Sequence, residues 1–169
     1  MNLIFLIGFM GCGKTTSGKK LASSLGYNFI DPDHVLEAQI GMTIPEYFST
    51  HSEEEFRKLE SEILKTTQYP QNTIVSTGGG LPCFFDHMEW MNNHGQTVYI
   101  QLSPKALASR LDHPKASRPV LQGKKGGELV AFIEHKLAER ESYYLQATHT
   151  VNGIDLSAEK VAEVTGLKD

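Results

Sequence analysis

The densest chemistry in the sequence lies in residues 8–15, GFMGCGKT, directly after the apolar run Leu3 to Ile7. These residues match the pattern G-x-x-x-x-G-K-[ST], in which glycines let backbone N–H groups point inward around a phosphate. Lys14 supplies a cation for the outer phosphates, and the Thr15 hydroxyl can bind Mg²⁺. A glycine-rich turn that binds nothing has no need of Lys14 and Thr15 together, so the segment predicts a phosphate-binding loop.

Asp31 and Asp33, separated by a proline, follow the second predicted strand. Ligands of open α/β sheets bind at the carboxyl ends of the strands, so both carboxylates are expected beside the phosphate-binding loop. Asp31 can hold a water of the Mg²⁺ shell, while Asp33 can accept a proton or hydrogen bond from a substrate hydroxyl. The structural alternative is that Asp31 ends the strand and Asp33 caps a helix.

Three glycines, Gly78, Gly79 and Gly80, end the third predicted strand. They remove every side chain and let a ligand touch backbone N–H groups. Ordering three consecutive glycines is entropically costly, which favours a substrate platform over a plain turn. No aspartate ends this strand, so Asp31 is the better predicted metal partner.

Two arginines, Arg57 and Arg140, can act together on a small acid, because guanidinium groups bind carboxylates with two parallel hydrogen bonds. Each also has a plainer interpretation as a solvated ion pair. Glu53 and Glu60 lie at helical spacing from Arg57, and Glu141 is next to Arg140. The residues alone leave both interpretations open.

Helical periodicity lapses over residues 112–127, a stretch rich in glycine, proline and cations that contains Arg118. Long loops inside compact domains are usually functional, so we expect a mobile lid, with Gly123, Gly126 and Gly127 as hinges. The alternative is a surface excursion without a function.

Aromatic residues outside these segments favour packing over ligand stacking. Trp90, Phe84 and Phe85 are expected in the core. Phe48 and Phe56 are compatible with lining a ring-shaped substrate, and equally with core packing.

Length and composition indicate a single domain over residues 1–169, with 40% hydrophobic and 21% charged residues. No apolar run is long enough to span a membrane, and no signal peptide is indicated, so a cytoplasmic location is expected. The net charge of −4 argues against nucleic acid as a partner. The two cysteines show no metal-binding or disulfide pattern.

Apolar runs alternate with amphipathic stretches, which predicts an α/β fold with a parallel sheet and helices on both faces. Strands are expected at residues 3–7, 28–30, 73–76, 97–102 and 148–151. Helices are expected at 14–25, from about 33 to 41, from capping boxes at Thr43 and Ser52, at 104–111 and from about 128 to 144.

Taken together, five motifs in order along the chain resemble the shikimate kinase family. They are GFMGCGKTT at 8–16, DPD at 31–33, EFRKLE at 55–60, GGG at 78–80 and RPVL at 118–121. The resemblance implies the three-layer fold of nucleoside monophosphate kinases, with sheet order 2-3-1-4-5, substrate-binding helices at about 33–62 and a lid. It implies transfer of the ATP γ-phosphoryl group to the 3-hydroxyl of shikimate, with Mg²⁺, in the pathway to chorismate and the aromatic amino acids.

Residue roles follow from the same resemblance. The shikimate-binding residues are Asp33, Arg57, Gly79, Gly80 and Arg140, with both arginines on the carboxylate. The nucleotide-binding residues are Gly11, Cys12, Gly13, Lys14, Thr15, Thr16, Arg110 near the adenine, and Arg118 on the phosphates. Lys14, Asp33 and Arg118 are the predicted catalytic residues, and Thr15 and Asp31 the predicted metal partners.

The sequence departs from the family pattern in three places: Cys12 replaces Ala or Ser, Thr15 replaces the commoner Ser, and the segment Asn152-Gly153 replaces one that often carries an arginine beside the adenine. The working hypothesis is a monomeric shikimate kinase. One rival is a sister kinase for gluconate or a nucleoside monophosphate. The other is a nucleotide-sensing module without chemistry, which would bind ATP but release no ADP.

Overall fold

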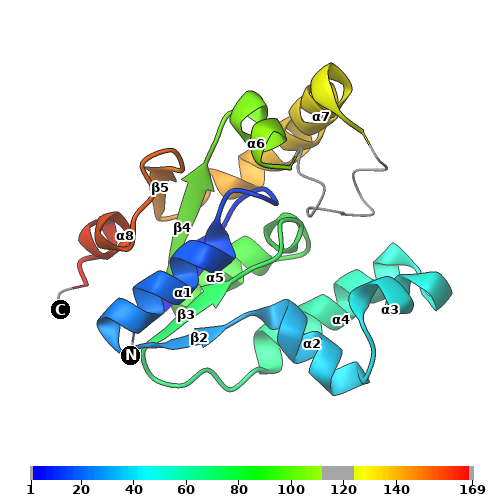
Figure 1. Cartoon of the computed structure of the whole chain (residues 1–169). Helices are drawn as coiled ribbons and strands as arrows, with labels where there is room; N and C mark the ends of the chain where they lie inside the picture. The colour runs from blue at the N-terminus through cyan, green and yellow to red at the C-terminus, as the bar shows by residue number, and fades with distance from the viewer. Residues whose placement is uncertain (1, 112–123, 168–169) are drawn as a thin grey trace.

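The computed structural model describes residues 2–111 and 124–167. A five-stranded parallel sheet with the order β2-β3-β1-β4-β5 runs through them, as the family resemblance implies (Figure 1). The strands are β1 Leu3–Ile7, β2 Asn28–Ile30, β3 Thr73–Ser76, β4 Gln96–Gln101 and β5 His149–Asn152. The helical segments are α1 Lys14–Leu25, α2 Pro32–Ile40, α3 Ile44–Thr50, α4 Glu53–Thr66, the 3₁₀ turn η1 Leu81–Cys83, α5 His87–His94, α6 Pro104–Leu111, α7 Gly126–Tyr144 and α8 Ala158–Thr165.

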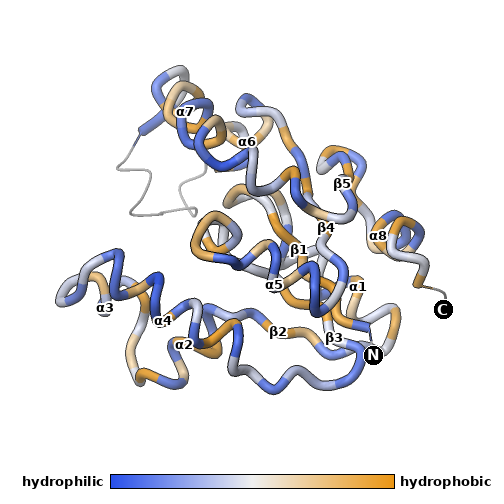
Figure 2. The backbone as a smooth tube through the Cα atoms, turned by 180° about the vertical axis from the view of Figure 1, so that it is seen from behind, coloured by the Kyte–Doolittle hydropathy of each residue, from blue (hydrophilic) through white to orange (hydrophobic). Residues whose placement is uncertain are grey.

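The central strand β1 pairs with β3 on one side and β4 on the other. Its five residues, LIFLI, are at most 4% exposed, and the trace around β1 is orange in Figure 2. A parallel strand that helices cover on both faces needs such a continuous apolar run rather than alternation. The loop that follows β1 therefore emerges at the middle of the carboxyl edge of the sheet.

Successive residues of β1 face two different hydrophobic clusters. Ile4 and Leu6 pack in one cluster with side chains of α1, α6, α7 and α8. Leu3, Phe5 and Ile7 pack in the other with side chains of α4, α5 and the end of α7. The sheet thus has helices on both faces, which confirms the predicted three-layer architecture.

A third cluster joins α2 and α4 through Leu36, Phe56 and Ile63, and Ile44 and Tyr47 of α3 pack against it. In Figures 1 and 2 these three helices lie at one end of the molecule and α8 lies at the other, while α6 and the start of α7 lie at the top of both views. These helices cover residues 32–66, the range in which the resemblance predicts substrate-binding helices.

Several helix ends follow their capping signals. Gly26 and Gly41 adopt left-handed conformations at the ends of α1 and α2. The Thr43 capping box is complete, whereas Ser52 accepts from the Glu55 backbone N–H without the reciprocal bond to its own N–H. Ser103 accepts from the backbone N–H of Ala106 at the start of α6.

Some predicted boundaries were wrong. Asp31, not Asp33, is the N-cap of α2, because its Oδ1 accepts the backbone N–H of Asp33 at 3.0 Å. The strands β4 and β5 are each shifted by one residue from the prediction. Helix α7 begins at Gly126 rather than near Glu128, so Gly126 and Gly127 lie in its first turn. Helices α5 and α8 were not predicted.

No helix in residues 2–111 and 124–167 is long and apolar enough to cross a membrane.

Candidate active site

A cleft of about 580 Å³ opens at the carboxyl ends of β1, β2 and β3. Its walls come from the β1–α1 loop, the start of α2, the segment after β3 and one side chain of α6. The lining residues are Met10, Gly11, Gly13, Lys14, Thr15, Thr16, Asp31, Asp33, His34, Ser76, Thr77, Gly78, Gly79 and Arg110. The first two predicted motifs and part of the glycine motif therefore meet in one cleft.

The β1–α1 loop owes its shape to backbone conformation. Gly8, Gly11 and Gly13 have φ angles of +147°, +81° and +100°, a region that disfavours residues with a Cβ. Gly13 is the N-cap of α1 and provides no side-chain cap for the first N–H groups of the helix. An uncapped helix N-terminus attracts anions, so the loop is suited to a phosphate.

Lys14 folds back over this loop and is 8% exposed. Its Nζ donates to the carbonyl oxygens of Gly8 and Phe9, at 2.6 and 3.0 Å. It also lies 3.6 Å from Cys12 Sγ. These bonds hold the ammonium group at the cleft, and no carboxylate of residues 2–111 and 124–167 forms an ion pair with it, so within this part of the chain its positive charge is available to a ligand.

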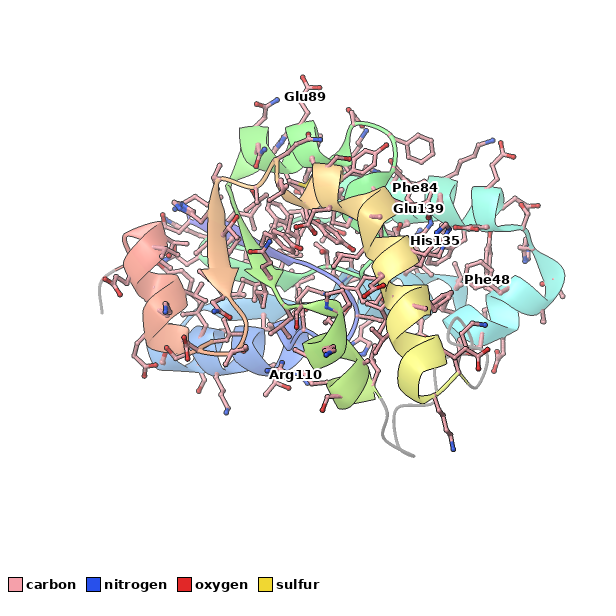
Figure 3. All side chains as sticks on the ribbon, turned by 90° about the horizontal axis from the view of Figure 1, so that it is seen from above. Phe48, Phe84, Glu89, Arg110, His135 and Glu139 are labelled. Atoms are coloured by element: carbon pink, nitrogen blue, oxygen red, sulfur yellow. The ribbon has the colours of Figure 1, made fainter. Side chains whose placement is uncertain are left out.

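Cys12 is fully buried in the cluster beneath α1, so its side chain belongs to the core. Its carbonyl oxygen accepts from Arg110 Nη1 at 3.2 Å, and the Gly153 carbonyl accepts from Arg110 Nη2 at the same distance. Arg110, which is labelled on α6 in Figure 3, thus joins the phosphate-binding loop to the segment after β5.

Oxygen atoms suited to Mg²⁺ gather on the other side of the loop. Thr15 Oγ1 lies 3.4 Å from Ser76 Oγ, and both residues line the cleft with Asp31. The Asp31 Oδ1 atom caps α2, so only its second oxygen is open to a ligand. Hydroxyl and carboxylate oxygens are ligands that Mg²⁺ prefers, although the described residues contain no cluster of three or more His, Cys, Asp or Glu that could hold a metal unaided.

Asp33 lies in the first turn of α2, facing the glycines after β3. Burial is the main cause that raises the pKa of its carboxyl group to about 6, and the negative charge of Asp31 adds to it. A Cβ built on Gly78 would lie 3.5 Å from Asp33 Oδ2. Near neutral pH this carboxylate is ionised and basic enough to accept a proton.

Arg57 and Glu60 form a buried ion pair on α4. Arg57 Nη1 donates to Glu60 Oε1 at 2.9 Å, and Glu60 is 2% exposed. Burial raises the pKa of Glu60 to about 7 against the lowering effect of Arg57. The expected pair with Glu53 is also present, at 3.6 Å, but that carboxylate is 66% exposed.

Arg140 projects from α7 toward the same place. Its Nη1 atom is buried and has no hydrogen-bond partner within the described residues. The expected ion pair with Glu141 is absent there, since Glu141 accepts from Tyr99 and Gln101 instead. A Cβ built on Gly79 would lie 3.5 Å from this unpaired Nη1.

Gly80 lies next to the guanidinium group of Arg57. A Cβ at this position would lie 2.5 Å from Arg57 Nη2, although the φ of −89° would suit any residue. Tyr144, from the end of α7, donates its hydroxyl proton to the Gly79 carbonyl oxygen at 2.5 Å. We call Arg57, Glu60, Gly79, Gly80 and Arg140 the two-arginine pocket.

Sequence reasoning named most of this site and missed part of it. Apart from Cys12, whose side chain is buried in the core, the predicted residues of the loop, the two aspartates, the glycines, both arginines and Arg110 border the cleft or the adjoining two-arginine pocket. Arg118 lies outside the described residues. Glu60, Ser76 and Tyr144 were not predicted to take part, and a buried carboxylate three residues after Arg57 looks in the sequence like a surface ion pair.

A P-loop fold with a basic, glycine-lined pocket beside its phosphate site defines the class of small-molecule kinases. The family model described as shikimate kinase matches residues 10–166. The shikimate kinase of Parabacteroides distasonis is 42% identical over 100% of this chain and 95% of its own.

Solved structures agree. Shikimate kinase from Bacteroides thetaiotaomicron superposes with a TM-score of 0.92 at 40% identity, covering 98% of this chain and 99% of that one. The enzyme from Acinetobacter baumannii, in complex with shikimate, gives 0.82 at 30% identity over 97% and 90%. The chain belongs to the shikimate kinase family, and it is an ATP-dependent phosphotransferase.

Proposed function

We propose that the chain transfers the γ-phosphoryl group of ATP to the 3-hydroxyl of shikimate, giving shikimate 3-phosphate and ADP on the way to chorismate and the aromatic amino acids. The observation that carries this proposal is the unpaired, buried Arg140 Nη1 beside Arg57, next to a phosphate-binding loop. A buried cationic donor without a partner is costly, and a substrate carboxylate would satisfy it.

The nucleotide half of the site is assigned to the β1–α1 loop. The backbone N–H groups of residues 11–16 and the Lys14 ammonium would hold the phosphates. Arg110, between the loop and Gly153, would lie near the adenine. Arg118 is assigned to the phosphates by the family motif alone.

Thr15 and Asp31 would hold Mg²⁺ with the phosphates, and the neighbouring Ser76 hydroxyl suits the same role. The bound ion would neutralise charge on the transferring group. Little covalent chemistry then falls to the protein, which acts by positioning and by electrostatic stabilisation.

In the acceptor half, Arg57 and Arg140 would grip the shikimate carboxylate while Gly79 and Gly80 leave room for its ring. Asp33 would accept the proton of the attacking hydroxyl, because it lines the cleft together with Lys14 and Thr15 and its pKa is raised to about 6. Phe48 and Phe56, with ring centroids 4.8 Å apart, contact each other where α3 meets α4, and neither is among the residues that line the cleft.

The test is ADP release from ATP, with Mg²⁺ present or chelated, in parallel reactions with shikimate, gluconate, AMP and no acceptor. We expect release with shikimate alone, and only with Mg²⁺. Release with gluconate or AMP instead would keep the kinase and discard the acceptor. ATP binding without release in any reaction would favour the sensing module.

We also infer that the chain works as a monomer in the cytoplasm, without nucleic acid or membrane partners. The net charge of −4 argues against nucleic acid as a partner. Light scattering of the purified protein tests the monomer, and fractionation of cells tests the location.

A further inference from the structure

The guanidinium group of Arg57 lies near two aromatic rings. Its Cζ atom is 4.2 Å from the ring centroid of Phe84 and 5.3 Å from that of Phe56. Both distances are within the range of a cation–π interaction, and the Phe84 contact is the closer. In Figure 3, Phe84 lies beside α4 on the segment between β3 and α5.

The two rings differ in what else they do. Phe56 is 5% exposed and packs in the cluster that joins α2 and α4. Phe84 belongs to none of the three hydrophobic clusters, and the prediction that it packs in the core was wrong. Its position is therefore explained by Arg57 rather than by core packing.

The backbone fixes Phe84 at this place. It follows the η1 turn, in which Cys83 N–H donates to the Gly80 carbonyl, and its own carbonyl accepts from His87 N–H at 3.2 Å. The next residue, Phe85, has a φ of +50°, which is strained for an aromatic residue, and its side chain is turned out to 60% exposure. Adjacent phenylalanines thus face opposite environments, one on the arginine and one in solvent.

A stacked ring orients an arginine without occupying its donors. The N–H groups of a guanidinium lie in its plane, whereas a ring covers its face. Arg57 Nη1 is already taken by Glu60, and its Nε is buried without a partner among the described residues. An additional carboxylate in place of Phe84 would compete with the substrate for these donors, but a ring does not.

We propose that Phe84 is a positioning residue that holds the plane of the Arg57 guanidinium ready for the substrate carboxylate, and that it sets the affinity for the acid without taking part in phosphoryl transfer. The proposal rests on the proposed function, in which Arg57 binds the shikimate carboxylate. It predicts a defect in KM for the acceptor and not in kcat.

The experiment compares Phe84→Leu, which removes the aromatic face, with Phe84→Tyr, which keeps it. The matched control is Phe85→Leu, the same change at the exposed neighbour, where an L residue stays at the strained φ. We expect Phe84→Leu to raise the KM for shikimate about five- to thirty-fold, the factor that a desolvated cation–π contact supplies. The kcat and the KM for ATP should stay within about two-fold, and Phe84→Tyr and Phe85→Leu should behave as the parent protein does.

The carboxamide of shikimate, used as an alternative acceptor, distinguishes a loss of carboxylate binding from a general packing defect, because it has no anionic group for Arg57. With this analogue, Phe84→Leu and the parent protein should differ by less than about two-fold in KM. An equal penalty with shikimate and with the carboxamide would overturn the proposal, as would an unchanged KM for shikimate or an equal loss in kcat.

The Arg57→Ala variant separates the two levels of the proposal. If Arg57→Ala weakens shikimate binding in calorimetry and Phe84→Leu does not, the stacking role fails while the carboxylate site stands. If Arg57→Ala leaves the affinity unchanged, or the parent protein does not phosphorylate shikimate, the proposed function of the pocket fails and the role of Phe84 with it.

Discussion

The phosphate-binding loop and the two-arginine pocket adjoin one another but are built in different ways. The loop needs its glycines for conformation, since Gly8, Gly11 and Gly13 all have positive φ. The pocket needs Gly80 for space, since its φ of −89° is ordinary and only the nearby Arg57 excludes a Cβ. One region is a property of eight consecutive residues, and the other exists only when α4, α7 and the segment after β3 come together.

This difference has an electrostatic counterpart. Lys14 is held by carbonyl oxygens of its own loop. Arg57, Glu60 and Asp33 instead bring charges of both signs into a buried space, and burial raises the pKa values of both carboxyl groups. Before a substrate binds, the pocket therefore carries a larger free-energy cost of buried charge than the loop does.

The largest expected effect comes from Asp33→Asn, which removes the proposed proton acceptor and keeps the shape of the side chain. We expect kcat to fall by at least about 10²- to 10³-fold, because the attacking hydroxyl loses its base. ATP affinity should be unchanged, since the loop does not depend on this carboxylate. Steady-state kinetics with calorimetric titration of ATP makes the check, and near-normal turnover would remove Asp33 from the mechanism.

Substitutions of glycine by alanine distinguish glycines that are needed to leave space from glycines that are needed for their backbone conformation. Gly80→Ala would place a Cβ 2.5 Å from Arg57 Nη2, and the arginine is confined by Glu60 and two rings. We expect the KM for shikimate to rise about 10- to 100-fold, the factor associated with hydrogen bonds to a charged group. Kinetics with each substrate varied in turn measures it.

Two other glycines serve as controls for that change. At Gly78 a Cβ would meet Asp33 Oδ2 at an ordinary 3.5 Å, so Gly78→Ala should alter the KM for shikimate by less than about three-fold. Gly11 has a φ of +81°, and a Cβ there would lie 2.8 Å from Leu111 Cδ2. Gly11→Ala should therefore raise the KM for ATP. A larger effect of Gly11→Ala on the KM for shikimate than on that for ATP would contradict the division of the site.

The same division limits what the sequence alone can predict. The loop could be predicted because its functional residues are consecutive in the sequence, and β1 could be predicted because its apolar run is continuous. Arg140 is 83 positions from Arg57 in the sequence. Because Glu141 is the next residue after Arg140, the sequence suggested an ion pair between them, whereas in the structure Glu141 accepts from Tyr99 and Gln101. Only the family resemblance brought the two arginines together.

Missed elements have a similar cause. Helix α5 has eight residues and no side-chain cap at Asp86, and its buried residues His87, Met88 and Met91 make too short a pattern to stand out. Phe84 and Phe85 are identical in type and adjacent, so no periodicity separates the one on Arg57 from the one in solvent. Their difference arises from the positive φ of Phe85, which the sequence does not reveal.

The dependence of activity on pH should follow the ionisation of Asp33 rather than that of a group in the phosphate-binding loop. Asp33 must be ionised to accept a proton, and its pKa is about 6 in the free protein. With ATP saturating, kcat/KM for shikimate should be level above pH 7 and fall about tenfold per unit well below pH 6. Circular dichroism over the same range checks that the fold persists. A profile that stays level to pH 5 would contradict the raised pKa.

The smallest expected effect is on stability, and its sign opposes that on activity. In the unfolded chain Asp33 has its ordinary pKa of 3.8, whereas in the folded protein the pKa is about 6. Ionisation therefore disfavours the folded state, so the contribution of this carboxyl group to stability is lost as the pH rises from about 4 to above 6. An amide at the same place has no charge to bury. Asp33→Asn should accordingly raise the Tm by about 2–4 °C at pH 8 and leave it unchanged at pH 4.

Glu54→Gln, at a side chain that is 79% exposed, is the matched control and should shift the Tm by less than about 1 °C at either pH. Calorimetry of the three proteins measures it. No gain at pH 8 would mean that the carboxylate is already well solvated in the free protein. The difference between the loop and the two-arginine pocket would then rest on the buried Glu60 and on Arg140 Nη1, which has no hydrogen-bond partner among the described residues.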